Sequence, residues 1–292
     1  MMKTYTLTLL GMFSATAVAA VEINESMDAA ADGIVSISNV AGSVDVQGWS
    51  RNQVEITGEI GRDIEELIFE RDGDEIDIKV KTKGRNSHDV DADLVIKVPD
   101  GSTLEINTVS ADIDVAEVTG EQSLESVSGD IATQVFASDV EVNSVSGDLE
   151  IEGDSQSTRA RLSSVSGDID TDSLGGEIAA ESVSGDLVVV NGVFERASLD
   201  TVNGDIVFHA QLLNEGRLDI ETVNGSVDIK FAGDVSARFD IETFNGEIRN
   251  CFGPKAVRVS EHGPGYELSF TEGGGSGRVT IETLNGDLRL CK

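Results

Sequence analysis

A six-residue pattern recurs along this 292-residue chain and constrains its fold more than any other feature. The pattern is ESVSGD at residues 125–130, drifts to DTVNGD at residues 200–205 and ends as ETLNGD at residues 282–287. Its glycines serve as markers, with successive steps of 18, 20, 18, 19, 21, 21 and 40 residues; they are Gly129, Gly147, Gly167, Gly185, Gly204, Gly225, Gly246 and Gly286. A period of this length predicts a solenoid, in which each coil buries its apolar face only against its neighbours.

Apolar and polar residues alternate on both sides of each marker, and β-branched types dominate, which indicates strands rather than helices. The position five residues before the marker holds Leu124, Val142, Leu162, Leu199, Ile220, Ile241 and Ile281, and the position two residues after it holds Ile131, Leu149, Ile169, Leu187, Ile206, Val227, Ile248 and Leu288. With only 4% aromatic residues, stacked aliphatic ladders are expected to fill a narrow core without large rings. We therefore predict an all-β fold, a parallel β-helix or β-solenoid with about 18–21 residues per coil. Its turn is expected to be right-handed, the usual sense of a parallel crossover.

The alternation slips at each V-S-G or V-N-G, as expected at a corner between two strands. We expect the marker glycine to supply a left-handed backbone there, and the valine two residues before it, such as Val127, to seal the core. The Ser or Thr before that valine, such as Ser126, is expected to stack its hydroxyl with those of neighbouring coils. A catalytic role for these residues is disfavoured, because eight similar copies lack a histidine partner and the chain holds only 3 His.

Composition and repeats divide the chain into four sections. They are a signal peptide at residues 1–20, an N-terminal β section that caps the stack at 21–100, regular solenoid repeats at 101–250, and an extended last coil with an insertion and a C-terminal staple at 251–292. The signal peptide is predicted from Lys3, an apolar run and small residues at 17–19. Within the cap, residues 39–49 hold one isolated repeat and residues 63–75 fit either a short helix or a strand. No later run approaches the roughly 20 apolar residues of a membrane-spanning helix.

Cys251 and Cys291 are the only cysteines, and each lies five residues after a marker glycine. Oxidising conditions after export favour a bridge between them. A disulfide needs Cα atoms about 4.4–6.8 Å apart, so it can join only adjacent coils. We expect the bridge, with residues 253–277 inserted as a hairpin; two ordinary coils in the 40-residue step would prevent it. A metal site is the weaker interpretation, because two Cys without nearby His give too few ligands.

Two columns of acidic residues are expected along the stack. One follows the marker glycine and comprises Asp130, Asp148, Asp168, Asp186, Asp205, Glu247 and Asp287; the other, four residues before the marker, comprises Glu125, Glu181, Asp200, Glu221, Glu242 and Glu282. Carboxylates about 4.8 Å apart repel by about 1 kcal/mol per pair even in water, so something should offset this cost. A solvated, counterion-bearing face is one interpretation. Weak Ca²⁺ binding by the first column is the other, although no EF-hand or RTX pattern is present.

The charge balance narrows the partners. With 21 Lys plus Arg against 54 Asp plus Glu, the net charge is -33, which repels nucleic acids and anionic lipid surfaces. Polysaccharide-active enzymes also use parallel β-helices, but their sites need aromatic platforms, and Trp49, Tyr5 and Tyr266 are the only Trp and Tyr here. Arg249 and Arg289 occupy equivalent coil positions and are expected to pair with neighbouring acids. We predict no catalytic residues, no enzyme activity and, apart from the calcium hypothesis, no cofactor.

The units S-V-S-G-D-I and T-V-N-G-D-I, the V-P-D-G at residues 98–101 leading into LEINTVSADIDV, and the earlier GSVDVQGW together resemble the bacterial putative-adhesin family of unknown function. The resemblance covers about residues 33–292 and implies an exported β-solenoid with an adhesin-like, envelope-associated role. It transfers no catalytic residues. We predict a rigid acidic surface that binds an envelope protein or glycan.

Two other functions and three locations stay open. A periplasmic scaffold or self-assembling stack is the first alternative function, and a polysaccharide-active β-helix enzyme is the second. The periplasm is the favoured location, with the cell surface or secretion as alternatives.

Overall fold

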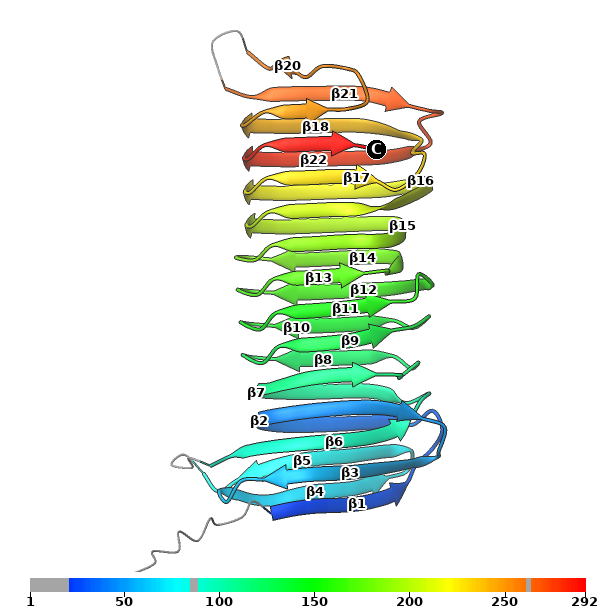
Figure 1. The fold of residues 1–292 in the computed structure, drawn as a ribbon, viewed down its shortest axis with the longest axis vertical. Coiled ribbons are helices and arrows are strands. Elements are labelled where there is room, and N and C mark those ends of the chain that lie inside the picture. Colours follow the sequence, from blue (N-terminus) through cyan, green and yellow to red (C-terminus); the bar gives the residue numbers. More distant parts are fainter. Residues whose placement is uncertain (1–20, 85–88, 261–263) are drawn as a thin grey trace, which may run out of the picture.

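The computed structural model describes residues 21–84, 89–260 and 264–292, so the expected signal peptide lies outside the described residues. Figure 1 shows the strands stacked into one long column. All the secondary-structure elements in the described ranges are β-strands, which confirms the all-β prediction, and most strand pairs are parallel. The handedness and the number of residues per coil stay predictions. These described ranges contain no helix long and apolar enough to cross a membrane.

The central coils follow the order of the chain. They comprise β7 (Thr103–Ala116), β8 (Gln122–Ser126), β9 (Ile131–Val135), β10 (Val140–Ser144), β11 (Leu149–Gly153), β12 (Ser157–Ser164), β13 (Ile169–Asp172), β14 (Gly175–Ser182) and β15 (Leu187–Asn203). Strands β8, β10, β12 and β14 pair in parallel before the bend, and β9, β11, β13 and β15 do so after it. The register places Leu124 beside Val142 and Val142 beside Leu162, all at most 2% exposed. The expected aliphatic ladder is therefore present.

The N-terminal strands do not stack in chain order. They are β1 (Val21–Asp28), β2 (Ile34–Trp49), β3 (Gln53–Ile60), β4 (Ile64–Asp72), β5 (Glu75–Thr82) and β6 (Asp91–Pro99). Strand β2, which carries the isolated repeat, lies between β7 on one side and β5 and β6 on the other, in parallel with all three. Antiparallel pairs β1–β3, β3–β6 and β4–β5 cover this end of the stack. The segment that fitted a helix or a strand forms β4 and turns into β5 at Gly73, whose φ is 67°.

The C-terminal strands depart from chain order in the same way. They are β16 (Ile206–Asn224), β17 (Val227–Phe231), β18 (Ala237–Asn245), β19 (Ile248–Asn250), β20 (Val257–Arg258), β21 (Tyr266–Glu272), β22 (Gly277–Asn285) and β23 (Leu288–Cys291). Strand β22 lies between β16 and β18, and β23 lies between β17 and β19 (Figure 1). The last coil of the sequence is therefore not the last coil of the stack. Strand β21 pairs antiparallel with β18, and β20 pairs antiparallel with β21.

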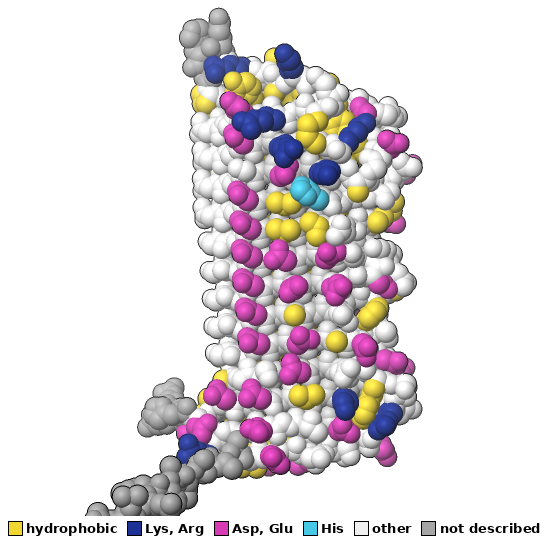
Figure 2. Space-filling model, viewed as in Figure 1, with side chains coloured by type: hydrophobic (Ala, Val, Ile, Leu, Met, Phe, Trp, Pro, Cys, Tyr) yellow, Lys and Arg dark blue, Asp and Glu magenta, His cyan; other side chains and the backbone are white. Residues whose placement is uncertain are grey.

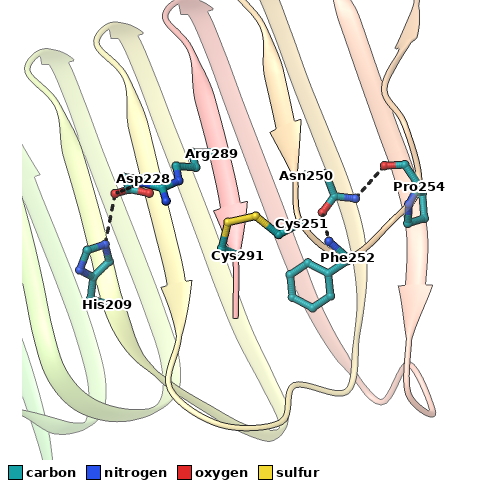
Figure 3. Close-up of a disulfide and its surroundings, with 8 residues drawn as sticks. All are labelled: His209, Asp228, Asn250, Cys251, Phe252, Pro254, Arg289 and Cys291. Atoms are coloured by element: carbon teal, nitrogen blue, oxygen red, sulfur yellow. Dashed lines mark hydrogen bonds and ion pairs between the residues drawn. A yellow bond between two sulfur atoms is a disulfide. The ribbon is translucent and has the colours of Figure 1, made fainter.

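The expected disulfide joins Cys251 and Cys291, whose Cα atoms are 4.9 Å apart (Figure 3). The two cysteines lie on adjacent coils, as the distance argument requires. The bridge ties the end of the chain, in β23, to the segment that follows β19. The coil formed by β22 and β23 has a neighbouring coil on each side, so these two strands have no free edge.

Aromatic side chains fill part of the core near the C-terminal end, contrary to the expectation of a core without large rings. Phe194, Phe208 and Phe239 are fully buried, and rings in neighbouring coils have centroids 5.8 Å apart for Phe194–Phe208 and 4.5 Å apart for Phe239–Phe270. Phe252 joins this cluster from the segment beside the disulfide. The low aromatic content is therefore concentrated in one part of the core rather than spread along it.

The glycine at each bend is required by contact between coils, and the prediction of a left-handed backbone is wrong. None of the eight marker glycines has a positive φ. A Cβ atom at Gly185 would lie 2.1 Å from the carbonyl oxygen of Gly167, and one at Gly204 would lie 2.0 Å from that of Gly185. Successive glycine backbones thus pack directly against each other, at a separation that leaves no room for a side chain.

The bend valines face solvent, so the prediction that they seal the core is also wrong. Val127 is 45% exposed and Val202 is 41% exposed. Strand alternation continues into the bend: Leu124 and Ser126 point inward, while Glu125 and Val127 point outward. The bend itself is closed by the marker glycine and by the buried hydroxyl residue.

The bend hydroxyls bind backbone groups, not each other as the sequence had suggested. The Oγ atoms of Ser126, Ser144 and Ser164 each accept the N–H of their own marker glycine at 2.8 Å. Farther along, the Thr201 hydroxyl donates to the carbonyl oxygen of Gly185 in the preceding coil at 3.1 Å. These buried side chains satisfy the polar backbone of the bend.

Replacing Gly185 by Ala is expected to lower the free energy of unfolding by more than about 2 kcal/mol, because the new methyl group overlaps the Gly167 carbonyl and the two coils must separate. Urea denaturation followed by circular dichroism measures the change. Ser184→Ala is the control, since Ser184 lies in the same bend with an exposed side chain. Equal stability of the two variants would contradict the packing explanation.

Candidate binding groove

The acidic column that follows the marker glycines has a structural role. The Oδ1 atom of Asp130 accepts the N–H of Asp148 at 2.9 Å, and Asp148 accepts the N–H of Asp168 in the same way. The contact recurs between Asp112 and Asp130, Asp168 and Asp186, Asp186 and Asp205, Asp205 and Ser226, and Asp287 and Glu247. Figure 2 shows acidic side chains aligned in columns on one face of the stack. A hydrogen bond to a charged carboxylate offsets part of the repulsion between neighbours.

The described residues of this column do not form a preformed metal-binding cluster. Within the described ranges, no group of three or more His, Cys, Asp or Glu is placed to hold a metal ion. Weak calcium binding stays a prediction, since each of these Asp residues keeps a second carboxylate oxygen beside the one that accepts the amide.

Arg249 and Arg289 pair with acids. Arg249 lies 3.2 Å from Glu247. Arg289 lies 3.8 Å from Asp228, which also contacts His209 at 3.4 Å (Figure 3). His209 is the one histidine in the described part of the chain. Its contact with Asp228 joins two neighbouring coils and involves none of the serine or threonine residues of the bends.

The outward bend residues form an apolar stripe on the other side of the bend. The stripe continues through the earlier coils with Val109, Val127 and Val145, but only part of it lines a groove of about 880 Å³. The members that line the groove are 38–51% exposed; they are Val165, Val183, Val202, Val223, Leu284 and Phe244. The regularity of the stripe follows from the repeat, because each coil places the same outward position of the hexapeptide above the last.

A column of carboxylates runs beside the apolar stripe along the same groove. The register aligns Glu181 with Asp200, Asp200 with Glu221, Glu221 with Glu282 and Glu282 with Glu242. Glu267 of β21 continues the column beyond Glu242. Within the described residues none of these six acids forms an ion pair, and Asp200 alone has a side-chain hydrogen bond, from Ser198.

Burial, together with the neighbouring charges of the column, raises the pKa of Asp200. Desolvation raises the pKa of Asp200 above its ordinary value, and the charges of Glu221 and Glu181 raise it further, while the hydrogen bond from Ser198 lowers it. The groove is therefore a strip of strongly negative potential beside an apolar surface.

The inserted hairpin closes one end of the groove. Val259, Pro264, Gly265 and Tyr266 line it there. The Arg258 Nε donates to the Tyr266 hydroxyl at 3.1 Å, and its guanidinium lies 5.4 Å from the centre of the Tyr266 ring. Tyr266 thus lies at the end of the apolar and acidic groove.

Asparagine side chains stiffen the bend beneath the groove. Where the hexapeptide changes from S-G to N-G, Asn224 donates to Asn203 at 2.9 Å, Asn285 to Asn224 at 2.9 Å and Asn245 to Asn285 at 2.8 Å. The buried hydroxyls of Thr201, Thr222, Thr243 and Thr283 donate to marker-glycine carbonyls. These Asn and Thr side chains are therefore occupied in holding the coils together, which leaves the carboxylates and the apolar stripe as the groups that the groove offers to a partner.

Asp200→Asn is expected to raise the melting temperature at neutral pH and to have little effect near pH 3. A raised pKa means that the folded state binds the proton more readily, so this contribution to stability is present below the unfolded pKa and is lost as pH rises through the folded pKa. Melting curves across this pH range measure the change.

Asp172→Asn is the matched control with the opposite sign. Hydrogen bonds from Ser173 and Asn191 lower the pKa of Asp172, so its contribution is present above the unfolded pKa and is lost as pH falls through the folded pKa. This variant should be less stable at neutral pH. A destabilised Asp200→Asn at neutral pH would contradict the desolvation explanation.

Comparison with known proteins places the chain in a family. No curated protein matches it. It is similar to a solved structure of a putative cell adhesion protein from Clostridium sporogenes, at 11% identity and a TM-score of 0.25, covering 93% of this chain and 99% of that one. It is also similar to a putative adhesin from Parabacteroides distasonis, at 13% identity and a TM-score of 0.39, covering 92% of this chain and 97% of that one. Both TM-scores are below 0.5, so neither likeness bears on what this chain binds.

The family comparison covers most of the chain and confirms the resemblance found in the repeats. Residues 34–290 match the Toastrack DUF4097 family, and this range runs from β2 into β23 and includes every central coil. The chain belongs to the Toastrack DUF4097 family.

Proposed function

We propose that this protein is a non-catalytic, adhesin-like binding scaffold of the cell envelope, and that its groove holds a basic amphipathic helix of a partner protein. The observation that carries the proposal is the pairing of two continuous columns along one groove, one apolar and exposed, the other acidic and without ion pairs in the described residues. Each column alone is an ordinary consequence of the repeat. Together they define the surface chemistry of a partner.

The apolar column argues for an occupant. Contiguous exposed apolar surface rimmed by polar residues is typical of interaction sites. Here six successive coils present Val, Leu or Phe at the same outward position, and Tyr266 and Val259 extend the apolar lining at the end. The side chains are held by paired strands, so the strip is formed before any partner arrives and costs little ordering on binding.

The acidic column gives the sign of the partner's charge. Glu181, Asp200 and Glu221 lie on three adjacent strands and repel one another. Lysine or arginine side chains would relieve this repulsion with their charged ends and cover the valines with their aliphatic stems. A partner with both apolar and basic groups therefore matches the groove, whereas an uncharged glycan would leave the carboxylates without compensation.

The spacing favours a helix lying along the stack. Neighbouring strands are roughly 4.8 Å apart, so each column repeats at that distance. One turn of α-helix rises about 5.4 Å, so residues three and four apart on its apolar face come close to this repeat. An extended strand repeats its side chains on one face about every 6.8 Å and falls out of step within a few residues. Six coils cover roughly 25 Å, about the length of a 16-residue helix.

Export is part of the proposal. The disulfide between Cys251 and Cys291 is typical of an oxidising compartment, and the first 20 residues fit a signal peptide. We propose the periplasm as the location, with the partner helix on another envelope protein.

Binding to a synthetic helix with leucine on one face and lysine on the other tests the proposal. Val223→Ser should weaken binding about tenfold, because it removes apolar area at the middle of the groove, and Glu221→Gln should weaken it and reduce its dependence on salt. Fluorescence anisotropy of a labelled peptide measures both.

Matched controls come from coils outside the groove. Val127 and Glu125 hold the same hexapeptide positions as Val223 and Glu221 but do not line the groove, so Val127→Ser and Glu125→Gln should bind the peptide as the unmodified protein does. Equal losses of affinity in the two sets of variants would contradict binding in the groove. Equal binding of a helix with glutamate in place of lysine would also contradict it. Selective binding of a glycan instead would assign the groove to the other partner class.

A further inference from the structure

A column of arginines crosses the same strands as the groove, farther from the bend. The register aligns Arg196 with Arg217, Arg217 with Arg278 and Arg278 with Arg238. All four side chains are exposed. Arg278 stands between Arg217 and Arg238 because β22 is inserted between β16 and β18, so chain order alone does not reveal this sequence of neighbours.

Three of these arginines have no acidic partner among the residues that the structure describes. Arg196 pairs with Glu177 at 3.3 Å, but Arg217, Arg278 and Arg238 make no ion pair or side-chain hydrogen bond within the described ranges. This is unexpected in a chain with 54 Asp plus Glu and only 21 Lys plus Arg. Stacked guanidinium groups repel one another, so an anion bound between them would relieve that repulsion.

A small cavity lies at the three arginines. Its volume is about 260 Å³, and it is lined by Arg217, Arg238 and Arg278 together with Glu215, Gly216 and residues 275–277. Gly275 has a φ of 66° and lies against the Arg238 side chain, so the turn that precedes β22 forms one wall. The cavity thus offers three forked donors, with a single carboxylate in its lining.

We propose that Arg217, Arg278 and Arg238 form a binding site for a soluble, phosphate-bearing anion with at least two charged groups. Guanidinium forks match phosphate oxygens two at a time, which a lysine cannot do. Three arginines in a row suit two adjacent phosphoryl groups better than a single ion. An anionic bilayer would face the net charge of -33 across a whole side of the protein, whereas a small anion contacts only the cavity. We therefore assign a ligand from solution. This site is independent of the groove and of its proposed helix.

Isothermal titration calorimetry of the full-length mature protein with inorganic diphosphate at low salt tests the site. The unmodified protein should show saturable binding, and Arg278→Gln should weaken it at least tenfold. Arg278→Lys should recover only part of the affinity, because it restores charge without the fork. Glu215→Gln should strengthen binding by removing the carboxylate from the cavity.

Arg161→Gln is the matched control. Arg161 also lies on the outward face and lacks an ion pair in the described part of the chain, but it lines a different cavity with Glu121 and Glu141. Its binding should match that of the unmodified protein, and melting curves check that each variant is folded. Absence of saturable binding to the unmodified protein, or equal affinity of Arg278→Gln, would overturn the proposal.

Vesicle sedimentation distinguishes the source of the phosphate. We expect no binding to phosphatidylglycerol vesicles or to neutral phosphatidylcholine vesicles. Binding to the anionic vesicles that Arg278→Gln abolishes would instead assign a lipid headgroup as the source and overturn the soluble one.

Discussion

The direct contact between glycine backbones at the bend is the constraint on which the rest of the structure depends. Every marker glycine after Gly129 lies against the carbonyl of the marker in an adjacent coil, as Gly147 does with Gly129 and Gly286 with Gly225, whereas Gly129 itself lies against the carbonyl of Ala111. This contact aligns the coils at one edge, and every other column follows from that alignment. The aliphatic ladders, the aspartate-to-amide bonds, the asparagine column, the groove and the arginine column are all consequences of one shared register.

The two ends of the stack are built by inserting a strand between neighbours. Strand β2 enters beside β7 at one end, and β22 enters between β16 and β18 at the other. At the C-terminal end the insertion has further effects. It completes the acidic and apolar columns with Glu282 and Leu284, places Arg278 between Arg217 and Arg238, and brings Cys291 to Cys251.

Sequence periodicity predicted much of the fold, and its failures have physical reasons. The ladder positions, such as Leu124 and Ile131, and the cysteine pair followed from the repeat. Strict alternation from Leu124 already places Val127 on the outward face with Glu125. The prediction that the valines are buried was wrong because it followed their hydrophobicity instead of this alternation. The order of the terminal coils was not available, because Ile281 can stack on Ile220 or Ile241 equally well. The arginine column depends on that order, so it could not be foreseen.

The central structural claim is that strand alternation continues through the closely packed glycine bend, so that the bend valines face outward and form the groove. The thiol reactivity of single cysteines introduced at Val202 and at the ladder position Leu199 tests it most directly, because the native cysteines are both in the disulfide. We predict that Val202→Cys reacts with a maleimide in the folded protein at nearly the rate of the unfolded chain, while Leu199→Cys is protected. Protection at both positions would show that the valine is buried at the bend and would contradict the account.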